Sequence, residues 1–192
     1  MLPDGTGLRL TTTRAGNVIG GGDWAEARIV PDCMRAWAAG ESVELRAPFA
    51  TRPWQHVLEP LGGYLWLAKR LWESPELHGE AFNFGPDASV NQPVAELVEQ
   101  MARQWPTSPW RIAADAGKLQ KKEAGLLKLC CDKALYHLSW QATLSFDETA
   151  QMTSQWYRNY YEDPQSATAL TDADIERYES LARERQRAWA LA

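Results

Sequence analysis

Three consecutive glycines, Gly20 to Gly22, follow a stretch of β-forming residues and precede a predicted helix. A glycine turn at such a place can bring backbone N–H groups and the positive end of a helix together, which suits a phosphate group. The turn lacks the G-x-G-x-x-G spacing of dinucleotide-binding loops, and no Lys-Ser/Thr pair follows it. A tight turn that binds nothing therefore remains the alternative interpretation.

Three arginines are expected near the same edge as this turn. Arg28 lies in the first helical turn after the glycines, Arg46 ends a predicted strand, and Arg52 lies in a loop bracketed by prolines. Guanidinium groups bind phosphate oxygens through paired, planar hydrogen bonds, so two or three of them beside a helix N-terminus favour a diphosphate ligand. The alternative is that the three are scattered over the surface.

The other reactive side chains give no complete mechanism. His56, on the edge of a predicted helix, could act as a general acid or base, but we interpret it as a hydrogen-bonded structural residue. His78 and His137 have no metal-binding spacing with any cysteine or histidine, so no metal site is expected. Cys130 and Cys131 are predicted to be buried in a strand rather than to act as nucleophiles. No catalytic residue is assigned.

The elements that must position these residues alternate between strand and helix. Apolar residues recur at three and four positions in the helices, and β-branched residues mark the first strand. The predicted strands are 8–18, 43–47, 81–84, 110–113 and 126–131, and the predicted helices are 27–39, 57–71, 94–101, 132–139, 146–160 and a last one from Thr171. This alternation predicts an α/β fold. We expect one domain over residues 1–163 and a helical appendage over 164–192, joined by a linker at 163–171.

Composition excludes several classes of protein. The chain has 192 residues, with 20 basic and 25 acidic side chains and a formal net charge of −5, which disfavours a nucleic-acid-binding module. A hydrophobic content of 45% argues against disorder. No apolar stretch approaches the roughly 20 residues of a membrane helix, and the N-terminus has no signal-peptide pattern, so we expect a cytoplasmic protein without membrane contact. Three cysteines imply no disulfide framework.

Four sequence blocks together resemble one enzyme family. They are T-R-A-G-N-V-I-G-G-G-D-W at 13–24, R-I-V-P-D at 28–32, R-P-W-Q-H-V-L-E-P-L at 52–61 followed by Gly63-Tyr64, and F-N-F-G-P at 82–86. These blocks resemble the C-terminal half of the CDP-glucose 4,6-dehydratases, which are extended short-chain dehydrogenases/reductases. The resemblance runs from about Leu8 to about Tyr161. It implies an α/β substrate-binding half, with the last Rossmann strand or strands at 8–18 and the N-terminal Rossmann half absent.

The resemblance implies an NAD-dependent hydride cycle. NAD oxidises the sugar of CDP-glucose at C4, water leaves across C5 and C6, and the hydride returns to C6, which gives CDP-4-keto-6-deoxyglucose. Such products feed deoxysugar biosynthesis for cell-surface polysaccharides such as the O-antigen of lipopolysaccharide. The family's glycine-rich NAD loop and Tyr-x-x-x-Lys pair precede the region found here. The chain alone is therefore expected to be an inactive fragment, with a separate Rossmann half or a homodimer partner as a candidate partner.

The resemblance also implies roles for five residues. Asn17 corresponds to the residue that contacts the sugar and its phosphate, and Val18 lies near the nicotinamide of NAD. Arg28 corresponds to a basic residue that meets the nucleotide. Arg52 corresponds to the diphosphate-binding arginine, and Arg46 is a weaker candidate for the same role.

The chain departs from the family pattern at two places. Lys-Lys-Glu-Ala stands at 121–124 where the family usually has Pro-His-Glu-Ala, and Leu129-Cys130 stands where it has Leu-Asp. Two alternatives to the dehydratase remain. One is a non-catalytic nucleotide-sugar binding or oligomerisation module, and the other is a different dehydratase or epimerase of the same superfamily with another nucleotide preference.

Overall fold

A computed structural model describes residues 7–87, 90–114 and 128–192, and it confirms an α/β architecture. The described strands pair two by two: β1 (Thr12–Ala15) with β6 (Ala81–Phe84), β2 (Asn17–Ile19) with β5 (Trp54–His56), and β3 (Val43–Leu45) with β8 (Trp110–Ile112), all parallel, and β4 (Thr51–Arg52) with β7 (Gln92–Pro93), antiparallel. The helices are α1 (Ile29–Ala38), α2 (Leu58–Glu73), α3 (Val94–Ala102), α5 (Asp132–Leu138), α6 (Phe146–Glu162) and α7 (Ala167–Glu184).

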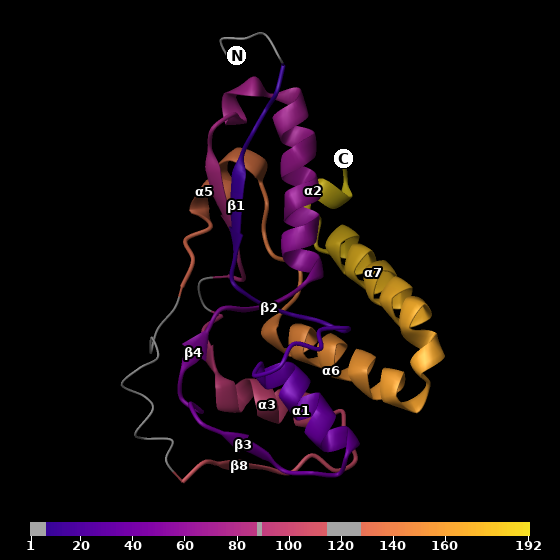
Figure 1. Ribbon diagram of the computed structural model, residues 1–192. Helices are drawn as coiled ribbons and strands as arrows, with labels where there is room; N and C mark the ends of the chain where they lie inside the picture. The colour runs from indigo at the N-terminus through magenta and orange to yellow at the C-terminus, as the bar shows by residue number, and fades with distance from the viewer. Residues whose placement is uncertain (1–6, 88–89, 115–127) are drawn as a thin grey trace.

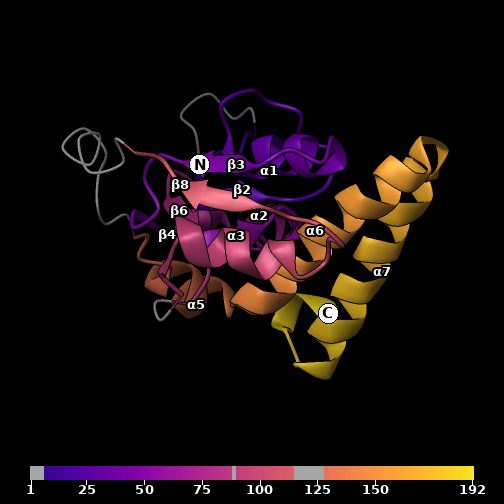
Figure 2. The same ribbon diagram turned by 90° about the horizontal axis from the view of Figure 1, so that it is seen from below.

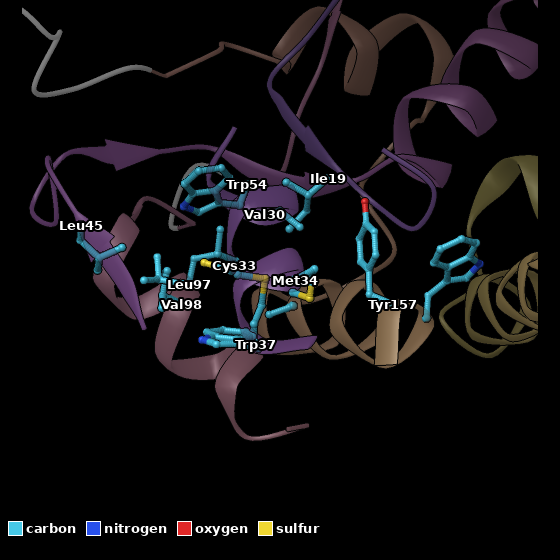
Figure 3. Packing of buried hydrophobic residues seen from close by; sticks show 14 of the residues in the cluster. Ile19, Val30, Cys33, Met34, Trp37, Leu45, Trp54, Leu97, Val98 and Tyr157 are labelled. Carbon is cyan, nitrogen blue, oxygen red and sulfur yellow. The ribbon is translucent and has the colours of Figure 1, made fainter. Parts of the chain in front are cut away.

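The elements form two regions that meet at β2 (Figure 1). One region contains β1 and β6 with α2 and α5, and its core includes the fully buried rings of Phe82, Phe84 and Trp140. The other contains α1, α3 and α6 with the β3–β8 pair (Figure 2), and its core joins Cys33, Met34 and other side chains of these elements (Figure 3). Burying one such side chain contributes roughly 1.5–3 kcal/mol, so each region has a substantial core.

The predicted strand 8–18 is instead two short strands separated at Gly16. β1 pairs with β6, and the chain then turns at Gly16 so that β2 pairs with β5. The Gly16 N–H donates to the Phe84 carbonyl and the Asn17 N–H to the Pro53 carbonyl, at 3.3 and 3.2 Å, so the two N–H groups have different partners. The prediction of one continuous strand was wrong because strand propensity does not reveal a change of pairing partner.

Three other local predictions were also wrong. Residues 128–131 form no strand, while 126 and 127 lie outside the described residues; Cys130 is exposed and Cys131 half-buried. The last helix begins at Ala167 rather than Thr171, because Pro164–Ser166 already forms a 3₁₀ turn whose first position tolerates proline. His56 ends β5 rather than lying on the edge of a helix.

A buried carboxylate ties the last helix to the rest of the protein. Glu59, in the first turn of α2, accepts hydrogen bonds from the backbone N–H groups of Thr143 and Leu144 at 2.7 and 2.6 Å. Its other oxygen accepts from the Tyr178 hydroxyl of α7 at 3.0 Å. Arg185, which follows α7, pairs with Glu148 of α6 at 2.6 Å. The α6–α7 arm on one side of the molecule is thus fixed to α2 (Figure 2).

Glu59 should make stability depend on pH. Burial raises its pKa from 4.5 to about 7, against the lowering effect of its three hydrogen-bond donors. A raised folded-state pKa means that the folded protein holds the proton more tightly than the unfolded chain, so stability is fully present below pH 4.5 and is lost as the pH rises through 7. In Glu59→Gln this loss, about 3 kcal/mol in the free energy of unfolding, should disappear.

Urea unfolding of both proteins between pH 4.5 and 8 measures the effect. The advantage of the wild type over Glu59→Gln should shrink steadily across this range. A difference that stays constant with pH would show that the carboxyl group has an ordinary pKa in the folded protein.

Candidate functional site

A cavity of about 610 Å³ opens between β2, the start of α1 and the segment from β3 to β5. All five residues assigned a binding role from the sequence line it: Asn17, Val18, Arg28, Arg46 and Arg52. They come from four separate elements or their ends and span 36 positions of the chain. The fold therefore brings the five predicted binding residues together at one cavity.

Short elements hold these residues in place. The β2–β5 ladder fixes Asn17 opposite Trp54 and Val18 opposite Gln55. Arg28 is the N-cap residue of α1, with extended backbone and no side-chain cap. Arg46 directly follows β3, and Arg52 pairs with Gln92 in the β4–β7 ladder. The site thus depends on pairings between segments that lie far apart in the sequence.

The loop between β3 and β4 is held by hydrogen bonds from the start of α3. The backbone N–H groups of Val94 and Ala95, at the start of α3, donate to the carbonyls of Ala50 and Pro48 at 3.0 and 2.9 Å. The indole N–H of Trp54 donates to the Gln92 carbonyl at 3.0 Å, and its buried ring forms part of the cavity wall. Trp54 and Val94 were not assigned a role from the sequence, where apolar wall residues look like ordinary core.

The cavity carries positive charge that its own acids only partly offset. Asp32 pairs with Arg35 at 2.6 Å, and Glu44 pairs with Arg111; neither of these two arginines lines the cavity. Asp23 lies 3.8 Å from Arg28, a long and exposed pair of little energetic value. With two of the three acids in its described lining paired to arginines from outside, the cavity favours an anion.

The start of α1 adds to this preference. Ile29 and Val30 line the cavity, and they occupy the first two positions of the helix. The first N–H groups of an α-helix have no carbonyl partner within the helix and carry the positive end of its dipole. Together with the arginines, this end of α1 suits phosphate oxygens.

A second cavity of about 330 Å³ adjoins the first. Asn17, Val18 and Arg28 line both, and the second is completed by Ala15, Gly16 and Leu129. Its wall is less charged than that of the larger cavity, with Arg28 as its one ionic side chain among the described lining residues. A ligand with a charged middle and a less charged end could therefore extend across Arg28 from one cavity into the other.

The glycine turn does not cradle a ligand in either cavity. Gly20, Gly21 and Gly22 are absent from both described linings. A Cβ on Gly21 would lie 2.1 Å from the Trp156 ring, and one on Gly20 would lie 2.7 Å from Val57. The glycines therefore allow a tight turn to pass close to these side chains, which is the alternative that the sequence left open.

His56 also lies away from both described cavities. It is fully buried, and its Nδ1 accepts from the Leu58 N–H at 3.4 Å. Burial, with a smaller contribution from the charge of Arg177, lowers its pKa to about 4, so the ring is neutral at pH 7. The described residues that line the larger cavity include no histidine, cysteine, tyrosine or lysine. The titratable acids among them are the carboxyl groups of Asp23, Asp32 and Glu44, each of which lies within 4 Å of an arginine.

Two further properties were searched for in the described part of the chain. No group of three or more His, Cys, Asp and Glu side chains there could hold a metal ion. None of its helices is both long and apolar enough to cross a membrane.

Comparison with known proteins gives one sequence relative and many related folds, while no protein-family model matches the chain. CDP-glucose 4,6-dehydratase of Salmonella typhimurium is 39% identical over 153 residues, which are 79% of this chain and 42% of that enzyme. The chain thus spans less than half the length of this relative.

Solved structures share the fold at low sequence identity. UDP-glucose-4-epimerase of Stenotrophomonas maltophila, with bound NAD and formylated UDP-arabinopyranose, has a TM-score of 0.65 at 17% identity, over 83% of this chain and 50% of that one. The dTDP-glucose 4,6-dehydratase of Bacillus anthracis, in complex with NAD, has a TM-score of 0.61 at 18% identity, over 83% and 47%. By sequence, the chain is therefore similar to part of a CDP-glucose 4,6-dehydratase, and it shares its fold with solved nucleotide-sugar epimerases and dehydratases.

Proposed function

We propose that this chain is the substrate-binding portion of a CDP-glucose 4,6-dehydratase and that its larger cavity holds the nucleotide diphosphate. The observation that carries the proposal is the convergence of Asn17, Arg28, Arg46 and Arg52 on one cavity. Sequence similarity to the Salmonella enzyme supports the choice of CDP-glucose over the ligands of the more distant epimerases.

Each residue then has a physical role in binding. Arg46 and Arg52 hold phosphate oxygens in the larger cavity, where the start of α1 adds two backbone N–H groups. Arg28 lies where the two cavities meet and contacts the phosphate nearest the sugar. Asn17 supplies an amide to the sugar and its phosphate. The glucose extends into the smaller cavity, where Val18 forms part of the wall.

The redox half of the reaction needs groups that these residues do not supply. A bound NAD would supply the hydride acceptor for C4 of the sugar and, after loss of water, the hydride donor for C6. The apolar side chains of Ala15, Val18 and Leu129 in the smaller cavity could pack against the flat face of a nicotinamide ring. The 192 residues contain no G-x-G-x-x-G loop and no Tyr-x-x-x-Lys pair. We therefore propose that the rest of the NAD site lies outside them and that this chain alone does not turn over CDP-glucose.

A second candidate function has one observation in its favour. Since the described walls of the larger cavity hold binding groups but no general acid or base free of an ion pair, a non-catalytic nucleotide-sugar binding or oligomerisation module would need nothing further. Turnover in the presence of a dinucleotide-binding half, described below, separates this module from the dehydratase.

Arg52→Ala should weaken binding of CDP-glucose by about 10- to 100-fold, because a hydrogen bond from a charged group is worth roughly 1.5–3 kcal/mol. Isothermal titration calorimetry with CDP-glucose measures this effect. Arg183→Ala is the matched control, since it removes the same charge from an exposed position on α7 where Arg183 pairs with Glu179. Equal affinity of Arg52→Ala and the wild type, or no binding by either, would contradict the proposal.

The region around β1 offers a surface on which a dinucleotide-binding half could pack. Within the described residues, β1 pairs with β6 alone, so one edge of β1 has no strand beside it. The outward face of α2 carries Leu61, Leu65, Ala68 and Trp72, of which Leu65 is 74% and Trp72 82% exposed. Spacings of four, three and four place these residues in one stripe. We name this stripe the α2 face.

A β-strand followed by a helix would cover both features at once. All-parallel sheets are found almost only where helices cover their faces, and α2 is the last α-helix of the long connection from β1 to its parallel partner β6, against which it packs. A further parallel strand beside β1 would place its own crossover helix next to α2. We propose that the dinucleotide-binding half of the enzyme covers β1 and the α2 face in this way.

Complementation tests this interface. The chain is mixed with a separate polypeptide that contains the amino-terminal half of the Salmonella enzyme, NAD and CDP-glucose. We expect the 4-keto product only in the mixture. Leu65→Asp should weaken the complex by tenfold or more, because it places a charge in an apolar contact. Leu191→Asp, at a position that is 64% exposed near the C-terminus, is the control. A complex that tolerates Leu65→Asp as well as Leu191→Asp would show that the halves meet elsewhere.

A further inference from the structure

The loop between β2 and α1 determines where Arg28 lies, and its backbone is strained. Ala27, directly before Arg28, has a φ of +59°, in the left-handed region that residues with a Cβ rarely adopt. Such a conformation persists only where the surrounding structure enforces it. The Arg28 side chain is 65% exposed, so its position depends mainly on this loop.

The side chain of Tyr157, on α6, anchors the loop between β2 and α1. Its hydroxyl donates to the carbonyl oxygen of Asp23 at 2.5 Å, and the residue is fully buried. The ring of Trp24 meets the Tyr157 ring edge to face at 5.2 Å. Burial, with the nearby charge of Asp23, raises the pKa of Tyr157, so its hydroxyl keeps its proton and remains a donor.

Asp23 links this anchor to the cavity. Its backbone carbonyl is held by Tyr157, one carboxylate oxygen accepts from the Ala25 N–H at 2.9 Å, and the other faces the Arg28 guanidinium at 3.8 Å. Asp23 and Arg28 both line the larger cavity, whereas Tyr157 does not. Because four residues, with the strained Ala27 among them, join Asp23 to Arg28, a displacement of the Asp23 backbone would shift the loop that places Arg28 at the junction of the two cavities.

We infer that Tyr157 is a positioning residue for diphosphate binding, which acts through Asp23 to hold Arg28 at the junction of the cavities. This inference rests on the proposed function for its ligand, but the contact itself does not. Tyr157 is 134 positions away from Asp23 in the sequence, so the C-terminal part of the chain would help to shape the larger cavity, whose described lining residues lie between 17 and 94.

A double-mutant cycle tests the inference. Tyr157→Phe keeps the ring and removes the hydroxyl, and it should weaken CDP-glucose binding about five- to twentyfold. If Tyr157 acts through Arg28, the same change in an Arg28→Ala background should alter the affinity by less than twofold. Binding of cytidine, which has no phosphate, should be unchanged by Tyr157→Phe. Tyr160→Phe is the control, since its ring belongs to the same aromatic group but does not hold Asp23.

An equal loss in the wild-type and Arg28→Ala backgrounds, or an equal loss for cytidine, would overturn the inference. Amide hydrogen exchange gives a second readout that needs no ligand. Tyr157→Phe should increase exchange at residues 20–28 at least fivefold while α3 stays unchanged, and unchanged exchange at 20–28 would also overturn the inference. If the wild type binds no CDP-glucose but exchange at 20–28 responds as expected, the proposed function fails and the anchoring role of Tyr157 stands.

Discussion

The exchange of hydrogen-bond partners at Gly16 is the constraint on which the rest of the structure depends. On one side of it the chain continues the ladder with β6, and on the other it begins the ladder with β5. A Cβ on Gly16 would lie 2.9 Å from the Pro53 carbonyl oxygen, closer than side-chain carbons normally approach. Gln55 secures the junction, because its side-chain amide donates to the Phe84 carbonyl at 3.0 Å. Without this junction, Asn17 and Val18 would not reach the segment that carries Arg52.

Helix α6 supports the cavity from the opposite side. It packs against α1, α3 and β5, and its residues Trp156 and Tyr157 lie against the turn that precedes α1. A capping box begins the helix, since Ser145 and Glu148 each satisfy the other's backbone N–H. Glu148 also holds Arg185, so the same carboxylate both starts α6 and fastens the segment after α7.

Much of this arrangement could be predicted from local sequence patterns. The spacing of apolar residues predicted four helices, α1, α2, α3 and α6. Each of them begins and ends within two residues of its predicted bounds. Sequence could not show that the run from 8 to 18 divides at Gly16, because the division depends on Pro53 and Phe84, far away in the chain. The same limit applies to the glycine turn, which is adjacent to Trp156 only after α6 has packed.

The site residues show the same division between local and long-range information. The type of Arg46 and Arg52 already suggests a phosphate ligand, but their shared cavity arises from the β4–β7 pair and from the bonds that α3 makes to the intervening loop. The charge balance of the cavity also cannot be read from its lining residues alone. Arg35 and Arg111, which do not line it, pair with Asp32 and Glu44, which do. Because these pairs leave the cavity arginines facing a smaller negative charge, the anion preference of the site is a property of the fold rather than of the number of arginines in the sequence.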